Sequence, residues 1–167
     1  MITTKRLTII PLTYDQLLLY LQGGQLLEKS LQLSDSPRTI APELKEALEE
    51  SILPNVLDPT QNPLFTTLWT AISREENTMV GDFCFHGAPN AEGEIEIGYG
   101  TYEAFQRKGY MTEMVGGMLD WLKTQPLVKS VVASTEKTNL ASFKVLERQG
   151  FVQSNQSESM DHWKLVL

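Results

Sequence analysis

The most informative segment of this chain is Gln106-Arg107-Lys108-Gly109-Tyr110-Met111-Thr112-Glu113. It lies between a strand pattern over residues 93–101 and a helix pattern that begins near Gly109. Backbone N–H groups at a helix start lack partners within the helix, and the helix dipole favours negative charge there. Arg107 and Lys108 add two cations suited to a diphosphate. The stretch therefore predicts an anion site, with an ordinary surface turn as the alternative.

The segments on either side of this stretch have different periodicities. Before it, Ile95, Ile97 and Tyr99 share one face of the expected strand, and the other face holds Glu94, Glu96, Gly98 and Gly100. After it, a helix that ends before Pro126 is expected, because apolar residues recur every three or four positions. This core-facing stripe consists of Met111, Met114, Val115, Met118 and Leu122.

Alternation and capping signals place the remaining elements. The other strands are expected at residues 7–12, 64–73, 79–86, 128–134, 151–152 and 163–167. The other helices are expected from the cap Thr13 to Leu21, from Pro42 to about Ile52 with Pro54 closing it, and after the cap Asn139 with Leu140, Phe143 and Leu146 inward. No linker or repeat interrupts this order. The sequence therefore predicts a single domain, residues 1–167, with helices packed on a mixed sheet.

Composition excludes several classes of protein. The 167 residues suffice for one domain with a substantial core. A formal net charge of −7 argues against nucleic acid as the main partner. The single cysteine cannot form an intrachain disulfide, and the first residues lack the apolar region of a signal peptide. A cytoplasmic protein without a membrane partner is expected.

Acidic residues gather in front of the basic turn. The window 75–105 contains no Lys or Arg, and its acids are Glu75, Glu76, Asp82, Glu92, Glu94, Glu96 and Glu103. An acidic wall beside a basic turn is suited to a cationic substrate next to an anionic cofactor. The alternative is that these acids are solvated surface, which is the preferred interpretation for Glu75, Glu76 and Glu92.

The order strand, basic Gly turn, helix, strand and Asn-capped helix resembles the GNAT superfamily of acyl-CoA N-acyltransferases. Its Gln/Arg-x-x-Gly-x-Gly/Ala signature is matched by Gln106 and Gly109, whereas Met111 stands where Gly or Ala is usual. Such a departure indicates either a slightly different turn or a side chain turned into the core. Four motifs of this chain resemble those of the ribosomal-protein acetyltransferase (RimJ/RimL-like) branch. They are Glu96-Ile97-Gly98-Tyr99, Asn139-x-x-Ser142, Val145-Leu146-Glu147-x-x-Gly150-Phe151 and Thr4-x-Arg6-Leu7.

This resemblance implies an α+β fold of three-layer type, with a mixed, mostly antiparallel central sheet and helices on both faces. It also implies an N-acetyltransferase that moves the acetyl group of acetyl-CoA to a primary amine of a protein N-terminus or a small molecule. No metal is implied. A non-catalytic acyl-CoA sensor or interaction module on the same fold is the alternative. The acceptor is expected to be cationic, its choice to depend on residues 23–63, and a homodimer stays open.

The resemblance also assigns cofactor-binding residues. The pyrophosphate of coenzyme A would lie on the turn formed by Gln106, Arg107, Lys108, Gly109, Tyr110, Met111 and Thr112. The pantetheine arm would add to the strand end at Tyr99, Gly100 and Thr101, with Asn139 and Ser142 beside it. Glycine within a strand often marks a close backbone approach, which suits Gly98 and Gly100. A twisted strand end and a helix N-cap at Asn139 are the structural alternatives.

Glu96, Glu94 and Ser142 are the candidate catalytic residues. An acceptor amine must lose a proton before it attacks a thioester, and a carboxylate can take that proton directly or through a water. Glu96 matches the family position before Gly-Tyr and is preferred to Glu94. Many relatives carry a tyrosine proton donor where this chain has Leu146, which leaves Ser142 or water to assist the leaving thiolate.

Cys84 and His86 alternate on one strand face. Two ligands without a third do not make a metal site, and the cysteine lacks a partnered base in its sequence neighbourhood. Both residues are therefore expected to be structural. His162 carries no interpretation from sequence.

Overall fold

The structure, a computed structural model, describes residues 1–167. Its strands are β1 (Ile2–Thr3), β2 (Leu7–Pro11), β3 (Leu68–Ser73), β4 (Thr78–Phe85), β5 (Glu94–Thr101), β6 (Ser130–Glu136), β7 (Val152–Gln156) and β8 (Met160–Val166). Its helices are α1 (Tyr14–Gln22), α2 (Leu26–Ser30), α3 (Pro42–Ala47), α4 (Leu53–Leu57), α5 (Pro63–Thr66), α6 (Tyr110–Leu122) and α7 (Leu140–Arg148). A π-helical turn, η1 (Leu48–Ile52), joins α3 to α4, and a 3₁₀ turn, η2 (Glu103–Phe105), follows β5.

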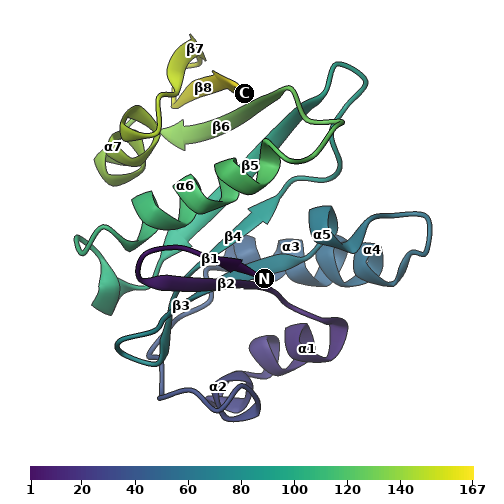
Figure 1. Ribbon diagram of the computed structural model, residues 1–167, viewed down its shortest axis with the longest axis vertical. Helices are drawn as coiled ribbons and strands as arrows, with labels where there is room; N and C mark the ends of the chain where they lie inside the picture. Colours follow the sequence, from purple (N-terminus) through teal and green to yellow (C-terminus); the bar gives the residue numbers. More distant parts are fainter.

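All strands belong to one eight-stranded sheet in the order β1-β2-β3-β4-β5-β6-β8-β7 (Figure 1). Only β5 and β6 pair in parallel, and the other neighbours are antiparallel. The expectation of a mixed, mostly antiparallel sheet is confirmed. The chain passes from β5 to β6 through α6, which is the crossover that a parallel pair requires.

Helices cover both faces of this sheet. The backbone of Gly81 on β4 lies against Met111 of α6, because a Cβ on Gly81 would be 3.0 Å from the Met111 methyl. The next residue, Asp82, accepts a hydrogen bond from Tyr20 of α1. Successive strand residues point to opposite faces, so α1 and α6 lie on opposite sides of the sheet. Most of the core packs between these layers, and the predicted α6 stripe from Met111 to Leu122 is buried as expected.

The parallel pair separates along its length. Its register runs from Glu94 opposite Ser130 to Ile97 opposite Ala133, where the ladder ends. Beyond this point β5 continues to Thr101 and β6 to Glu136 without pairing to each other. A V-shaped opening therefore begins at Gly98 on β5 and Ser134 on β6, and α6 starts near its wide end.

Two element predictions are wrong at proline residues. The strand expected from Leu64 begins only at Leu68, because Asn62 caps the short helix α5 and Pro63 occupies its first position. The helix from Pro42 was expected to end at Pro54, but it continues into α4. The η1 turn explains this, since the Leu53 N–H reaches back five residues to the Leu48 carbonyl and the wider turn makes room for the proline ring.

The remaining caps follow the sequence signals. Thr13 and Gln16 form a reciprocal capping box at the start of α1, and Gly23 ends that helix with a positive φ. Asn139 caps α7, whose Leu146 is fully buried. Leu140, expected to face inward, is 66% exposed because it lies on the outer side of the first turn.

Candidate active site

The turn between β5 and α6 presents a run of backbone N–H groups without partners. Gln106 N–H bonds the Glu103 carbonyl, and Glu113 N–H bonds the Gly109 carbonyl, but no N–H from Arg107 through Thr112 donates a hydrogen bond within the protein. Positive φ angles of 63° at Arg107 and 78° at Gly109 shape the turn. Glycine adopts such a φ without the Cβ penalty that other residues meet, which accounts for Gly109 at the helix start. The turn offers several donors to one anion.

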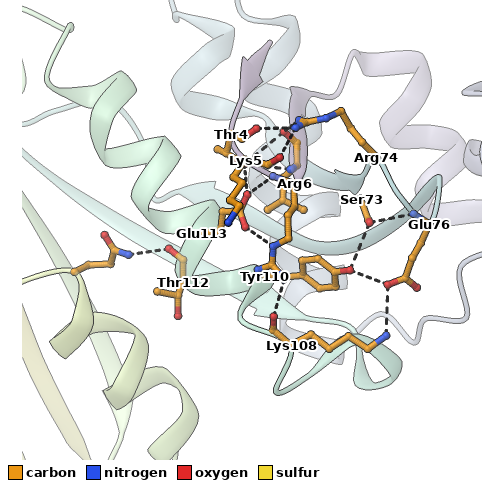
Figure 2. Close-up of polar contacts among 12 residues, drawn as sticks. Thr4, Lys5, Arg6, Ser73, Arg74, Glu76, Lys108, Tyr110, Thr112 and Glu113 are labelled. Carbon is orange, nitrogen blue, oxygen red and sulfur yellow. Dashed lines mark hydrogen bonds and ion pairs between the residues drawn. The ribbon is translucent and has the colours of Figure 1, made fainter.

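A clasp from the N-terminal segment holds this turn (Figure 2). One Glu113 oxygen accepts bonds of 2.6 Å from Thr4 Oγ1 and from the Arg6 backbone N–H. The other oxygen accepts a 2.6 Å bond from Arg6 Nε, and Arg6 Nη1 donates to the Lys108 carbonyl at 2.9 Å. The Thr4-x-Arg6 motif thus fixes both the last carbonyl of the turn and the first turn of α6.

The same clasp sets the charge of Glu113. Partial burial alone would raise the pKa of this carboxyl, but the hydrogen bonds from Thr4 and Arg6 outweigh it and hold the pKa below its usual value. Glu113 is therefore a fixed anion one turn into α6. A carboxylate in a first helical turn interacts favourably with the helix dipole.

Tyr110, the first residue of α6, contacts Arg6 and Glu76 and so helps to hold the turn in place. Its ring lies under the Arg6 guanidinium at 4.6 Å, and its hydroxyl donates a 2.7 Å bond to Glu76. Lys108 also approaches Glu76, with 3.5 Å between Nζ and Oε1, so one of the two predicted cations has an acidic neighbour (Figure 2). Arg107 makes no ion pair. Met111, which departs from the family signature, is buried in the core, so of the two sequence alternatives the inward-turned side chain is found.

Tyr99 and the start of α7 close one face of the V. The Tyr99 hydroxyl donates to the Ser142 carbonyl at 3.3 Å, and burial raises the pKa of Tyr99 to about 12. Asn139 Oδ1 accepts the Ser142 N–H at 3.1 Å, as expected for an N-cap. The structure therefore brings together Tyr99, Asn139 and Ser142 at the opening. Gly100 faces open space, and the Thr101 carbonyl accepts a long 3.5 Å bond from Gln106.

The two candidate glutamates have different neighbours. Glu94 makes a 2.6 Å ion pair with Lys164 on β8, at the closed end of the V. Glu96 lies at the opening, where one of its oxygens is 3.5 Å from His86 Nδ1 and the other accepts a 3.3 Å bond from Ser134. Ser134 Oγ is in turn 3.0 Å from His162 Nδ1. The geometry favours Glu96, because Glu94 already has a cationic partner.

A cavity of about 1080 Å³ lies on the sheet face opposite α6. Its walls come from β4, β5, η2 and the segment that carries α3, with Gly98, Gly100 and Gln106 along the β5 side. Its charged and imidazole side chains are Arg38, Glu43, Asp82, His86 and Glu103. The cavity therefore adjoins both the V opening and the turn before α6.

A buried carboxylate forms part of the cavity wall. Asp82 accepts bonds of 2.6 Å from the Tyr20 hydroxyl and 2.8 Å from the Tyr102 hydroxyl. Burial raises the pKa of Asp82 to about 6, although both hydroxyls and the nearby Arg38 act in the opposite direction. Arg38 stacks over the Tyr20 ring at 4.5 Å and forms a buried ion pair with Glu28.

Comparison with protein families decides the identity of the fold. Residues 6–152 match the model of the acetyltransferase (GNAT) domain, and this range includes the turn, the V and every residue that lines the cavity. The chain belongs to the GNAT acetyltransferase family. The predicted superfamily resemblance is confirmed.

A curated relative supports the same assignment for this GNAT domain. The Bacillus subtilis (strain 168) protein called uncharacterized N-acetyltransferase YjdG is 34% identical over 98 residues. The match covers 59% of this chain and 58% of that protein, so the chain spans little more than half the length of this relative.

Solved structures share the fold of this GNAT domain at low sequence identity. A ribosomal-protein-S5-alanine acetyltransferase from Vibrio fischeri superposes with a TM-score of 0.71 at 14% identity, covering 98% of this chain and 94% of that one. RimL, a ribosomal L7/L12 alpha-N-protein acetyltransferase solved with coenzyme A, gives 0.68 at 17% identity, covering 98% and 96%. Both neighbours carry names of the branch whose motifs the sequence resembles.

Sequence reasoning missed two cavity residues of this GNAT domain, His86 and Asp82. His86 was expected to be structural, and Asp82 was only one acid among several. Both could have been found from the β4–β5 register, which places Asp82 opposite Gly100 and brings the His86 N–H to the Glu96 carbonyl. None of the helices combines the length and the apolar character needed to cross a membrane.

Proposed function

We propose that this protein is an acetyl-CoA-dependent N-acetyltransferase acting on a primary amine of a protein N-terminus or of a small molecule. The observation that carries the proposal is the run of unpartnered N–H groups from Arg107 through Thr112, next to the V between β5 and β6. Family membership supports the same activity.

The turn and the V fit the two ends of a coenzyme A molecule. The unpartnered N–H groups, with the Arg107 and Lys108 side chains, would hold the pyrophosphate. The unpaired edge of β5 from Tyr99 to Thr101 would hydrogen-bond the pantetheine arm, which carries amide groups. Asn139 and Ser142 flank that edge from α7. Acetyl-CoA bound there would supply an acetyl thioester at the V opening.

The chain must also remove a proton from the acceptor. An alkylamine is mostly protonated at neutral pH, and its nitrogen attacks a carbonyl only after deprotonation. Glu96 lies at the V opening and takes part in this removal, whereas Glu94 is neutralised by Lys164. Ser142 Oγ, in the first turn of α7, would hydrogen-bond the leaving sulfur, because the buried Leu146 offers no donor.

The cavity favours a cationic acceptor. Glu43, Asp82 and Glu103 lie in its wall against a single arginine, Arg38, which is itself paired with Glu28. The acidic window contributes less than its length suggests, since Glu76 bonds Tyr110 and Glu94 bonds Lys164. Residues 37–47 supply one wall, which supports acceptor choice by the segment between Gly23 and Pro63.

The decisive experiment combines binding with transfer. Acetyl-CoA should raise the melting temperature of the protein, because a ligand of the folded state stabilises it by mass action. Acetyl transfer to a panel of polyamines, aminoglycosides and amino-terminal peptides should be detected by mass spectrometry. Charge reversal at Arg107 and Lys108 together should weaken acetyl-CoA binding, with a larger effect at low salt.

The outcomes separate the two classes of function. Absence of any thermal shift and of any binding heat at millimolar acetyl-CoA would reject the cofactor and the activity together. Binding without transfer to any amine would instead favour the sensor alternative. Glu147→Gln, a change at an exposed α7 residue whose side chain makes no ion pair, is the control for binding.

A further inference from the structure

Four polar side chains form a row across the sheet at the V opening. They come from four neighbouring strands or strand ends, and in order they are His86, Glu96, Ser134 and His162. The distances along the row are 3.5 Å from His86 Nδ1 to Glu96, 3.3 Å from Glu96 to Ser134 Oγ, and 3.0 Å from Ser134 Oγ to His162 Nδ1. Both oxygens of the Glu96 carboxylate are therefore held by neighbours within the row.

His86 is the member of the row that reaches the cavity. It belongs to the cavity wall, whereas Glu96, Ser134 and His162 do not. Its other ring nitrogen, Nε2, lies over Gly98, because a Cβ at that position would be only 2.9 Å away. Gly98 is the first β5 residue beyond the ladder with β6. The imidazole thus occupies the place where the two strands separate, and the glycine makes room for it.

This arrangement gives an imidazole the surroundings of a general base. A histidine takes up a proton near neutral pH, which suits it to accept a proton from an ammonium and release it again. The Glu96 carboxylate lies 3.5 Å from Nδ1, where it can orient the ring. Ser134 donates a 3.3 Å hydrogen bond to the other carboxylate oxygen and so supports Glu96 from the side away from His86.

We propose, on the basis of the acetyltransferase function above, that His86 is the catalytic base and that Glu96 is its positioning residue. His86 Nε2 accepts one N–H proton of the acceptor ammonium, which frees the nitrogen lone pair. The lone pair then forms the N–C bond to the thioester carbon, and the C–S bond breaks with its electron pair on sulfur. The second amine proton passes to the thiolate, directly or through water, and the imidazolium of His86 releases its proton to solvent, so that the products are a neutral amide, the thiol of coenzyme A and one proton.

Other titratable groups share the cavity with His86. In the cavity wall these groups are Asp82 and Cys84, together with Arg38, Glu43 and Glu103 from the facing segments. Glu96 contacts His86 from outside the cavity wall. The Cys84 thiol lies beside Gly98 on the same face as His86 Nε2, and burial raises its pKa to about 11. Tyr20, Tyr99 and Tyr102 all have raised pKa values and stay neutral in the range in which an imidazole titrates. Of these groups, Asp82 has the pKa closest to the range in which an imidazole titrates. Variants at His86 itself are therefore needed to assign a pH effect to the histidine.

The test is the pH dependence of kcat/KM for the best acceptor, from pH 5.5 to 9. In the wild type kcat/KM should rise with pH through an acid limb, because only the neutral imidazole accepts the proton. His86→Gln should lower kcat/KM by about 10²-fold and abolish the limb. Added imidazole should restore part of the activity of His86→Ala. Since the His86 side chain is 52% exposed, neither change should prevent folding.

Two further variants distinguish the roles. Glu96→Gln should lower kcat by about tenfold with little change in KM and should keep the acid limb, because the ring is less well positioned while His86 still accepts the proton. His162→Gln should keep the limb, since the chain has two histidines and only His86 lies in the cavity wall. This variant controls for a general effect of losing an imidazole.

Each outcome bears on a separate claim. A His86→Gln enzyme that keeps its rate and its acid limb overturns the inference while the acetyltransferase function stands. Loss of the limb in Glu96→Gln but not in His86→Gln makes the carboxylate the base and likewise overturns it. A wild type that binds acetyl-CoA but transfers it to no amine overturns the proposed function and the inference with it.

Discussion

Asp82 shows how one side chain can make stability depend on pH. Its carboxyl has a pKa of about 6 in the folded protein, above the ordinary value of 3.8, because burial disfavours the anion. Between these two pH values the folded state binds more protons than the unfolded chain. The free energy of unfolding must therefore fall as pH rises from about 4 to about 6. At pH 7 the accumulated loss is on the order of 3 kcal/mol.

Asp82→Asn should remove this loss, because an amide cannot ionise and can still bond the Tyr20 and Tyr102 hydroxyls. Urea unfolding at pH 4, 5, 6 and 7 would show that the free energy of unfolding of the variant increases relative to that of the wild type as pH rises. Tyr20→Phe is the paired variant, since removal of a donor that lowers the Asp82 pKa should extend the falling limb to higher pH. Parallel curves for the wild type and Asp82→Asn would contradict the assignment.

The start of α6 depends on a contact with a distant segment. Glu113 accepts three charged or polar hydrogen bonds from Thr4 and Arg6, while Arg6 also holds the Lys108 carbonyl. Glu113→Gln should lower the free energy of unfolding by about 1.5–3 kcal/mol, the usual range for hydrogen bonds to a charged group. It should also weaken acetyl-CoA binding, because the turn that presents the N–H groups is less firmly held.

The pH dependence of that variant has a definite sign. Glu113 has a lowered pKa in the folded state, so its contribution is present above the unfolded value and is lost as pH falls through the folded one. The difference between the wild type and Glu113→Gln should therefore shrink in acid. Glu147→Gln on α7 serves as the control in the same urea and calorimetry measurements. An affinity for acetyl-CoA unchanged by Glu113→Gln would show that the clasp is dispensable for the turn.

Local sequence signals correctly predicted those elements whose ends are set by residues within the element itself. The Thr13 and Gln16 box, the Asn139 cap and the change of period at Gly109 each act within a few residues, and each is found where the sequence puts it. The wrong predictions concern segments whose structure is set by the residues next to them. Pro54 ends an isolated helix but is tolerated after the wide turn η1. Likewise, the alternation of residues from Leu64 predicts a strand, but the Asn62 cap and Pro63 start the short helix α5 there instead.

The candidate site divides in the same way. The basic turn and Glu96 follow from motifs that are contiguous in sequence. His86 does not, because its importance comes from lying beside Glu96 and above Gly98 on the neighbouring strand. Arg6 belonged to a recognised motif, but its contact with residues more than a hundred positions away appears only in the folded chain.

The charge of the entire molecule should affect how the acceptor approaches. The net charge of −7 and the acids of the cavity attract a cation over a distance that salt shortens. The screening length falls from about 30 Å at 0.01 M salt to about 8 Å at 0.15 M. At saturating acetyl-CoA, KM for a polycationic amine should therefore rise about threefold to tenfold over this range while kcat changes little. A neutral amine of similar size should show no such rise, and a preference for neutral or anionic acceptors would contradict the proposal.

The two walls of the V come from separate parts of the chain, so one wall is synthesised before the other. Residues 1–122 contain β1 to β5 and α6, whereas β6, α7, β7 and β8 all come from residues 130–167. During synthesis β5 therefore emerges long before the strand that pairs with it. Until then it is an uncovered sheet edge with the apolar residues Ile95 and Ile97, and exposed edges of this kind promote association between chains. The same separation of the two walls that makes room for a ligand leaves this edge of β5 exposed to aggregation until β6 has emerged from the ribosome.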